Sequence, residues 1–248
     1  MGKIFDLDSP VVRVLNKVAD LMWLNILIMI CSIPIVTAGA SLTAAHYVAL
    51  KMRRDEESYI TKEFFKAFKM NFKQSTLIWL LMLVLASIFG VDYYLINNNP
   101  DLNIPEVVQV LVMAAGILFL FGAVWVFPVQ AKFVNTIPRT IKNAFALSMI
   151  QLPKTIVMII MYVLPWVILC FSLRVFPLVF VFGISVPVFV SAVFYNKMFK
   201  RLEDKILGRA EEEDGESDSD SEADSNEDSE KIFSDKPLIT DEEEQKHE

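Results

Sequence analysis

The sequence has few of the residues that build reactive or metal-binding sites. Its 248 residues include two cysteines and two histidines, and its eight glycines form no phosphate-binding or dinucleotide-binding pattern. Cys31 and Cys170 lie inside apolar runs with no second cysteine or histidine at ligand spacing, which excludes a disulfide framework and a cysteine metal site. No nucleophile with a neighbouring base can be recognised. We therefore expect no enzyme, no catalytic residue, no metal and no cofactor.

Charged side chains are missing from five long stretches of the chain. These stretches are residues 21–50, 74–91, 107–131, 155–173 and 175–196. A helix needs roughly 20 residues to cross about 30 Å of hydrocarbon, so each stretch is a candidate crossing. The stretches lack the two-residue alternation of membrane strands.

The sequence therefore predicts an all-α fold, a polytopic transmembrane helical bundle of about five spans within a membrane domain at 1–208. The spans are expected near 21–42, 74–94, 107–128, 155–173 and 175–196.

The net charge of −7 hides two oppositely charged parts. Residues 209–248 contain 18 acids and 4 bases and carry −14, whereas the preceding residues carry +7. Such an acidic low-complexity run has little apolar surface to bury, so we predict a disordered acidic tail. Two short apolar groups in it, Ile232-Phe233 and Pro237-Leu238-Ile239, are weak candidates for docking motifs.

The distribution of bases predicts the orientation in the membrane. Lys and Arg number 7 in residues 51–73, 4 in 132–154 and 5 in 197–209, and none occurs in 92–106. Because bases collect on the cytoplasmic side, we expect a multi-pass protein of the cell (plasma) membrane with its C-terminus in the cytoplasm.

The N-terminal bases fit a five-span arrangement poorly, and two alternatives address this. In one, residues 18–50 form a hairpin bent near Pro34 and Gly39, which gives six spans and both termini inside. In the other, residues 9–17 lie in the interface as a short amphipathic helix with Ser9 as its N-cap. The second is favoured because 33 residues fall short of the roughly 40 that two crossings need. A signal peptide cleaved after Ala40 is rejected, since the base-rich loop 51–73 would then lie outside.

Two features of the first apolar stretch are candidate sites. Small residues recur at four-residue spacing directly after Pro34, which predicts a helix-packing face or, alternatively, a kinked helix that binds a ligand. The candidate packing residues are Gly39, Ala40, Ser41, Thr43 and Ala44. Asn25 and His46 are candidate polar membrane residues, because polar groups in hydrocarbon are costly. We expect His46 near the cytoplasmic interface, within reach of water.

The loop after the first stretch contains a basic and aromatic helical pattern. Phe64, Phe65, Phe68 and Phe72 fall on one helical face, with Lys66, Lys69 and Lys73 on its flanks. This pattern predicts an amphipathic helix that lies on an anionic leaflet of the lipid bilayer or docks on a partner. The adjoining spans favour these readings over nucleic-acid binding. Residues 137–150 are a second amphipathic candidate.

The chain resembles the YesL family, small integral membrane proteins of Gram-positive bacteria with a domain of unknown function. The resemblance covers roughly residues 1–207 and is most specific in the first 75. The matching residues are Asp8-Ser9-Pro10, Asn16, Ala19-Asp20, Trp23-Leu24-Asn25, Pro34, Thr37 to Ala44, Tyr47 to Lys51, Arg54-Asp55-Glu56, Tyr59-Ile60, Phe64 to Lys69, Asn71 to Gln74, Phe127-Pro128, Lys142-Asn143-Ala144 and Leu152-Pro153.

The resemblance implies a role but no catalytic residues. Members are often encoded beside carbohydrate uptake transporters, which suggests a non-enzymatic accessory or regulatory partner of carbohydrate uptake. The partner would be a sugar ABC transporter permease or a membrane sensor. The alternative is a small transporter or oligomeric channel, which would need an internal repeat or polar residues along a path at mid-membrane. The sequence displays neither.

Overall fold

The computed structural model describes residues 10–56, 59–98 and 105–215. It is 92% helical and has no strand in these ranges, which confirms the all-α prediction. The elements are α1 (Pro10–Ser32), the 3-10 turn η1 (Ile35–Thr37), α2 (Ala38–Arg54), α3 (Ile60–Asn98), α4 (Glu106–Lys132), α5 (Ile137–Ile150), α6 (Leu152–Phe171), the 3-10 turn η3 (Leu173–Val175), α7 (Phe176–Phe182) and α8 (Ser185–Gly215). Helix α8 includes residues 209–215, so the disordered tail predicted from residue 209 is wrong for these residues. The acidic residues 216–248 lie outside the described residues.

Among the described residues, four helices are long and apolar enough to cross a membrane, and a bent pair makes a fifth candidate. The four are α1, α3, α4 and α6, and the bent pair joins residues 173–182 to α8 at an angle of 54°. The expectation of about five spans agrees with this count of long apolar helices, which does not include α2. The last expected span, near 175–196, is broken between α7 and α8.

The first apolar stretch is a helical hairpin, so the single span expected near 21–42 is wrong. Ser41 Oγ donates to the Ile28 carbonyl at 3.1 Å, and Lys17 Nζ donates to the Met52 carbonyl at 3.1 Å, which makes α1 and α2 antiparallel. The turn lies at Pro34, which has no N–H to continue a helix. Thr37 Oγ1 donates to the carbonyls of Cys31 and Pro34 at 2.6 and 2.8 Å and closes the turn.

The argument against a hairpin fails because helix α1 starts earlier than the charge-free run. It begins at Pro10, so residues 10–54 supply the two helices and the turn. Residues 10–17 are the first turns of this helix and not a separate interfacial helix. In addition, most residues of α2 are buried inside the protein, so α2 does not need a long apolar surface to face the lipid. The proposed Ser9 cap lies outside the described residues.

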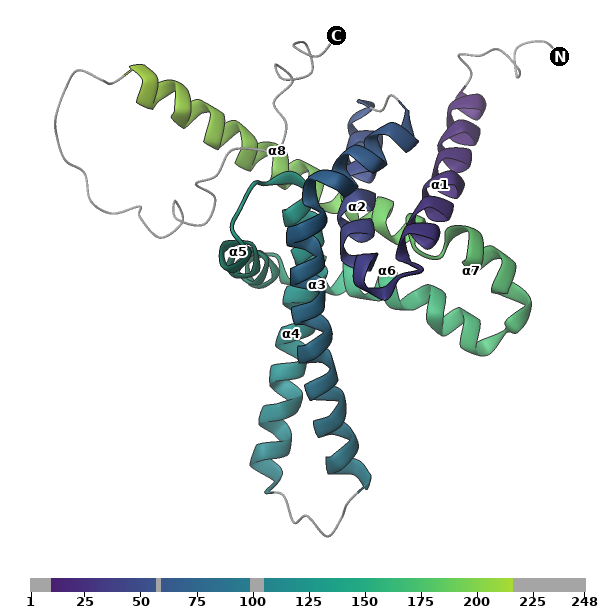
Figure 1. Ribbon diagram of the computed structural model, residues 1–248, viewed down its shortest axis with the longest axis vertical. Helices are drawn as coiled ribbons and strands as arrows, with labels where there is room; N and C mark the ends of the chain where they lie inside the picture. The colour runs from purple at the N-terminus through teal and green to yellow at the C-terminus, as the bar shows by residue number, and fades with distance from the viewer. Residues whose placement is uncertain (1–9, 57–58, 99–104, 216–248) are drawn as a thin grey trace.

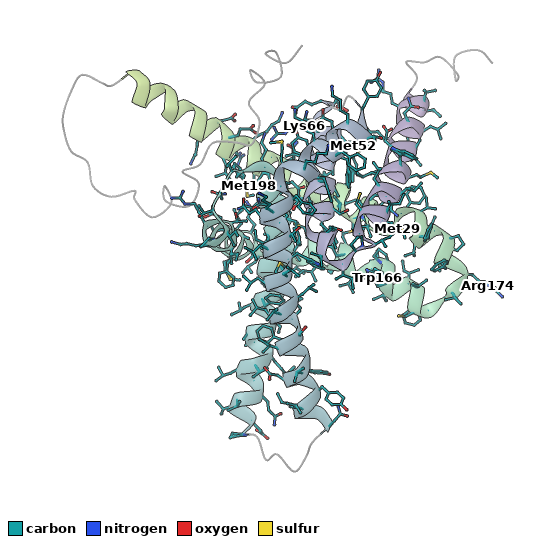
Figure 2. All side chains as sticks on the ribbon, in the orientation of Figure 1. Met29, Met52, Lys66, Trp166, Arg174 and Met198 are labelled. Atoms are coloured by element: carbon teal, nitrogen blue, oxygen red, sulfur yellow. The ribbon has the colours of Figure 1, made fainter. Side chains whose placement is uncertain are left out.

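Two further hairpins project from the centre in different directions (Figure 1). Helices α3 and α4 pair along their lengths, with Trp79 against Phe127 at 6.0 Å and Phe89 against Phe119 at 5.6 Å between ring centroids. Helices α6 and α7, joined through η3, form the other hairpin, whose tip carries Arg174 (Figure 2). Helix α5 covers the expected range 137–150 and packs on α4.

Helix α2 is the centre of the bundle and contacts α1, α3, α4 and α8. Small residues on α2 allow these helices to approach closely, and large side chains fill the space around them. The largest fully buried side chains include Trp125, Tyr195, Phe64, Phe133 and Phe199. The core is therefore a packed interior along α2.

Candidate functional site

At one end of the bundle, ion pairs join the ends of several helices, and we call this end the charged end. Glu203 of α8 pairs with Arg54 of α2 at 3.0 Å and with Lys132 of α4 at 2.6 Å. Lys51 of α2 pairs with Glu63 of α3 at 3.1 Å. These side chains are mostly buried. Figure 2 shows Met52 and Lys66 toward this end, away from the Arg174 tip.

The start of α1 also lies at the charged end. Lys17 Nζ contacts the Asp55 carboxylate at 2.6 Å. This hydrogen bond and the Lys17 charge hold the pKa of Asp55 below its ordinary value. Asp55 has a φ of 57° and ends α2 in the left-handed conformation. The bases at the start of α1 therefore lie beside those of the 51–73 segment.

A buried hydrogen-bonded chain links α2, α6 and α8, and we call it the His46 chain. His46 Nδ1 lies 3.1 Å from the Tyr195 hydroxyl, and Nε2 lies 3.1 Å from the Tyr162 hydroxyl. Tyr162 also hydrogen bonds with Ser191, and Ser191 Oγ donates to the Pro187 carbonyl at 2.7 Å. His46 is 3% exposed, so the expected access to water at the interface is wrong.

Both ring nitrogens of His46 have a tyrosine hydroxyl as partner. The tautomer of His46 decides which of the two bonds the imidazole donates and which it accepts. Every member is satisfied, and the chain ends at a carbonyl that cannot pass on a proton. The arrangement therefore locks three helices together.

Asn25 lies at the break between α7 and α8. Its Oδ1 accepts from the backbone N–H of Ile184 at 3.1 Å and of Ser185 at 2.9 Å, and its Nδ2 donates to the Phe180 carbonyl at 2.7 Å. A broken helix leaves backbone groups that hydrocarbon cannot satisfy, and one buried amide satisfies three of them. This residue therefore caps a broken helix.

The small-residue face is used inside the protein. A Cβ on Gly39 would lie 2.4 Å from Trp79 Cβ and 2.6 Å from the Ser75 carbonyl oxygen, so α2 and α3 are in backbone contact there. Thr43 Oγ1 lies 2.9 Å from Ser75 Oγ. Ser41 reaches α1, and Ala40 and Ala44 are fully buried. These residues form an internal packing face and not a surface for a partner.

The phenylalanines of α3 divide between the core and the surface. Phe64 is fully buried, and Phe68 stacks on it and packs against the core. Phe64 is therefore unavailable for docking, contrary to expectation, and Phe68 is only partly exposed. Lys66 is half-buried. The exposed part, which we call the α3 surface, consists of Lys62, Phe65, Lys69, Phe72 and Lys73.

The α3 surface belongs to a helix that continues into a membrane span. Helix α3 runs without a break for 39 residues, which is about 58 Å. Its first 14 residues, 60–73, extend about 21 Å before the charge-free stretch begins at Gln74. The α3 surface therefore belongs to the first turns of the helix that continues into the span, and not to a separate helix.

A group of amide side chains lies where α3, α4 and α5 meet. Gln130 Nε2 donates to Asn71 Oδ1 at 3.3 Å, and Thr140 Oγ1 donates to Gln130 Oε1 at 3.1 Å. The buried side-chain amides of Asn135 and Asn143 have no partner. Sequence reasoning missed this group and the partners of His46, because their spacing along single helices carries no sign of contact between helices.

Within the described residues, no three His, Cys, Asp or Glu side chains are grouped in a way that could hold a metal ion. The donors that do lie together are amides, hydroxyls and one imidazole. The geometry places no nucleophile beside a free base in the His46 chain, whose donors and acceptors are all paired.

Comparison with known proteins locates the similarity in the first part of the chain. A family model described as "Protein of unknown function, DUF624" matches residues 21–93. No curated protein and no solved structure gives a significant match. The matched range covers about half of α1, all of α2 and most of α3, and so contains Asn25, His46 and the α3 surface. Residues 21–93 are therefore similar to a family of unknown function.

Proposed function

We propose that this chain is a non-enzymatic accessory protein of the plasma membrane that binds a membrane partner through the α3 surface. The partner is a component of carbohydrate uptake, either a sugar ABC transporter permease or a membrane sensor. The resemblance to the YesL family supports the choice of carbohydrate uptake. The bundle supplies the rigid support for the surface.

The charged end is the cytoplasmic end in this proposal. Bases from the start of α1, the end of α2, the start of α3 and the end of α4 gather there. In the described residues that link α3 to α4 and α6 to α7, Arg174 is the single base. The α1–α2 hairpin removes the conflict with the positive-inside rule, because Arg13 and Lys17 come to the same end as the other bases.

One observation carries the proposal. The α3 surface alternates exposed bases with half-exposed aromatic rings, and it extends beyond the apolar part of its own helix. The Lys51–Glu63 pair joins this segment to α2, and Phe64 is fully buried behind it, so the exposed face has a packed support. Aromatic rings and bases on a preorganised face are typical of protein interfaces. An acidic, partly apolar cytoplasmic segment of the partner would fit it.

A small transporter is the second reading, and the His46 chain is its strongest support. That chain brings polar side chains into the middle of the bundle, which the sequence did not display. However, it is closed at the Pro187 carbonyl, and large buried rings fill the space beside it. These features favour a locked core over a solute path. Flux across liposomes that contain the purified chain separates the two readings.

The experiment is a quantitative pull-down from host membranes in mild detergent. Wild type is compared with Phe65→Ala/Phe72→Ala and with a control, Phe145→Ala/Phe171→Ala, which removes two exposed rings elsewhere. Loss of two interface rings costs about 1–2 kcal/mol, so we expect one or more sugar-uptake proteins to fall about tenfold in the first variant only. Equal recovery from both variants overturns the docking claim. Flux through liposomes together with equal recovery favours the transporter.

A further inference from the structure

The acidic end of the chain has the chemistry to bind the α3 surface. Residues 216–248 contain 14 acids and 3 bases. The α3 surface presents three exposed lysines, Lys62, Lys69 and Lys73, with Phe65 and Phe72 between them. Ile232-Phe233 and Pro237-Leu238-Ile239 are the apolar groups of the acidic segment, and Glu230 and Asp235 lie next to them. Both charge and apolar character are therefore complementary.

Helix α8, which the acidic segment follows, and helix α3 also meet α2 at the same end of the bundle. Glu203 of α8 and Glu63 of α3 pair with Arg54 and Lys51, which are neighbours in the last turn of α2. Residue 234 follows the end of α8 by 19 residues. Helix α8 continues for 12 residues, about 18 Å, beyond Glu203. Nineteen residues span at most about 65 Å when extended, so the acidic segment is long enough to return to the α3 surface, which is about 21 Å long.

We propose that residues 216–248 bind the α3 surface within the same molecule and compete with the partner for it. This inference rests on the proposed function, because it names the regulation of the same surface. Attachment to α8 gives the segment an effective concentration in the millimolar range, so weak charge pairing is enough for occupancy. The surface extends beyond the apolar part of α3, which favours a protein segment over lipid headgroups as its occupant.

The test is a cross-link within the purified full chain in neutral detergent, without lipid or partner. Both native cysteines are replaced by alanine, and Ser234→Cys is combined with Met70→Cys, beside Lys69. The control pair combines Ser234→Cys with Val14→Cys, which is also exposed at the charged end but lies on α1. We expect the disulfide to Met70→Cys to form about tenfold faster than the control, because docking raises the local concentration.

The charge dependence completes the test. Lys62→Gln/Lys69→Gln/Lys73→Gln should remove the advantage of the Met70→Cys pair, whereas Lys142→Gln/Lys200→Gln, two exposed bases elsewhere, should preserve it. Equal rates for the two cysteine pairs, or a rate advantage that the lysine changes do not lower, overturn the inference. A separate arm adds anionic vesicles. If the two cysteine pairs react at equal rates without lipid, and the vesicles abolish the cross-link at any ionic strength, lipid is the occupant and the inference also fails.

The cross-link needs no partner, so its outcome is separate from that of the pull-down. A charge-dependent cross-link together with unchanged recovery from Phe65→Ala/Phe72→Ala supports the intramolecular contact and contradicts the proposed function. Partner recovery that depends on the surface, together with equal cross-linking rates, supports the function and contradicts the contact.

Discussion

Single residues at helix contacts decide how closely this bundle can pack. Gly39 is the clearest case, because the backbones of α2 and α3 meet there without room for a side chain. Gly90, in contrast, lies on the long helix α3 and has nothing within 4 Å of the position that a Cβ would take. Replacement of each glycine by alanine therefore adds the same methyl group, once inside a helix contact and once outside one.

We predict that Gly39→Ala destabilises the protein by about 1–3 kcal/mol, because the added methyl forces the two helices apart. Gly90→Ala should be neutral or stabilising by up to about 1 kcal/mol, since alanine favours the helix. Unfolding in mixed micelles with increasing denaturing detergent measures both. Equal stability of the two variants would contradict the close contact.

The His46 chain makes a second prediction at the residue scale. Tyr195→Phe removes the hydroxyl partner of Nδ1 of His46 and leaves a buried ring nitrogen without a hydrogen bond. We expect a loss of about 1–3 kcal/mol. The exposed Tyr94→Phe serves as the control and should change stability little. A neutral Tyr195→Phe would mean that the chain contributes nothing to packing.

Helix elements are broken or joined by the polar groups at their ends. The α7–α8 break persists because Asn25 supplies the hydrogen bonds that the bent backbone lacks. We predict that Asn25→Ala costs about 2–4 kcal/mol, since two buried N–H groups and one carbonyl lose their partner. Asn16→Ala, on the exposed side of α1, should have little effect. Detergent unfolding and proteolysis near residue 183 provide the measurement.

Ion pairs join α2, α4 and α8 at the charged end. Glu203 accepts from both Arg54 and Lys132, so Glu203→Gln leaves two mostly buried cations with weakened partners. We predict a loss of about 2–3 kcal/mol, less than that for a fully buried pair because some water reaches this end. The neighbouring Asp204→Asn is exposed and should be close to neutral. An equal effect of the two changes would show that the pairs are solvated.

At the scale of the whole molecule, the α1–α2 hairpin sets which ends share one side of the membrane. We predict that Val11→Cys and Glu56→Cys both resist a membrane-impermeant thiol reagent in intact cells, whereas Arg174→Cys reacts. Replacement of both native cysteines by alanine provides the background. Reaction of Val11→Cys with the reagent from outside would support a continuous first crossing and would contradict the hairpin in the membrane.

Much of the helical fold was predictable from residues alone. Charge-free stretches of about 20 residues indicated the apolar helices, because hydrocarbon excludes charge whatever the tertiary contacts are. The range 137–150 was predicted to the residue for α5, since Pro138 starts the helix and the polar pattern follows its turns. The small residues after Pro34 indicated a close helix contact without indicating its partner.

The sequence by itself determined that this is a helical membrane protein with a basic body and an acidic end. Those properties are sums over local residues, so they need no contact map. Only the tertiary structure decided that α1 and α2 form a hairpin, that Phe64 faces inward while Phe65 faces outward, and that His46 lies between Tyr162 and Tyr195. These outcomes depend on which helices meet, and periodicity along one helix cannot identify the neighbour that covers each of its faces.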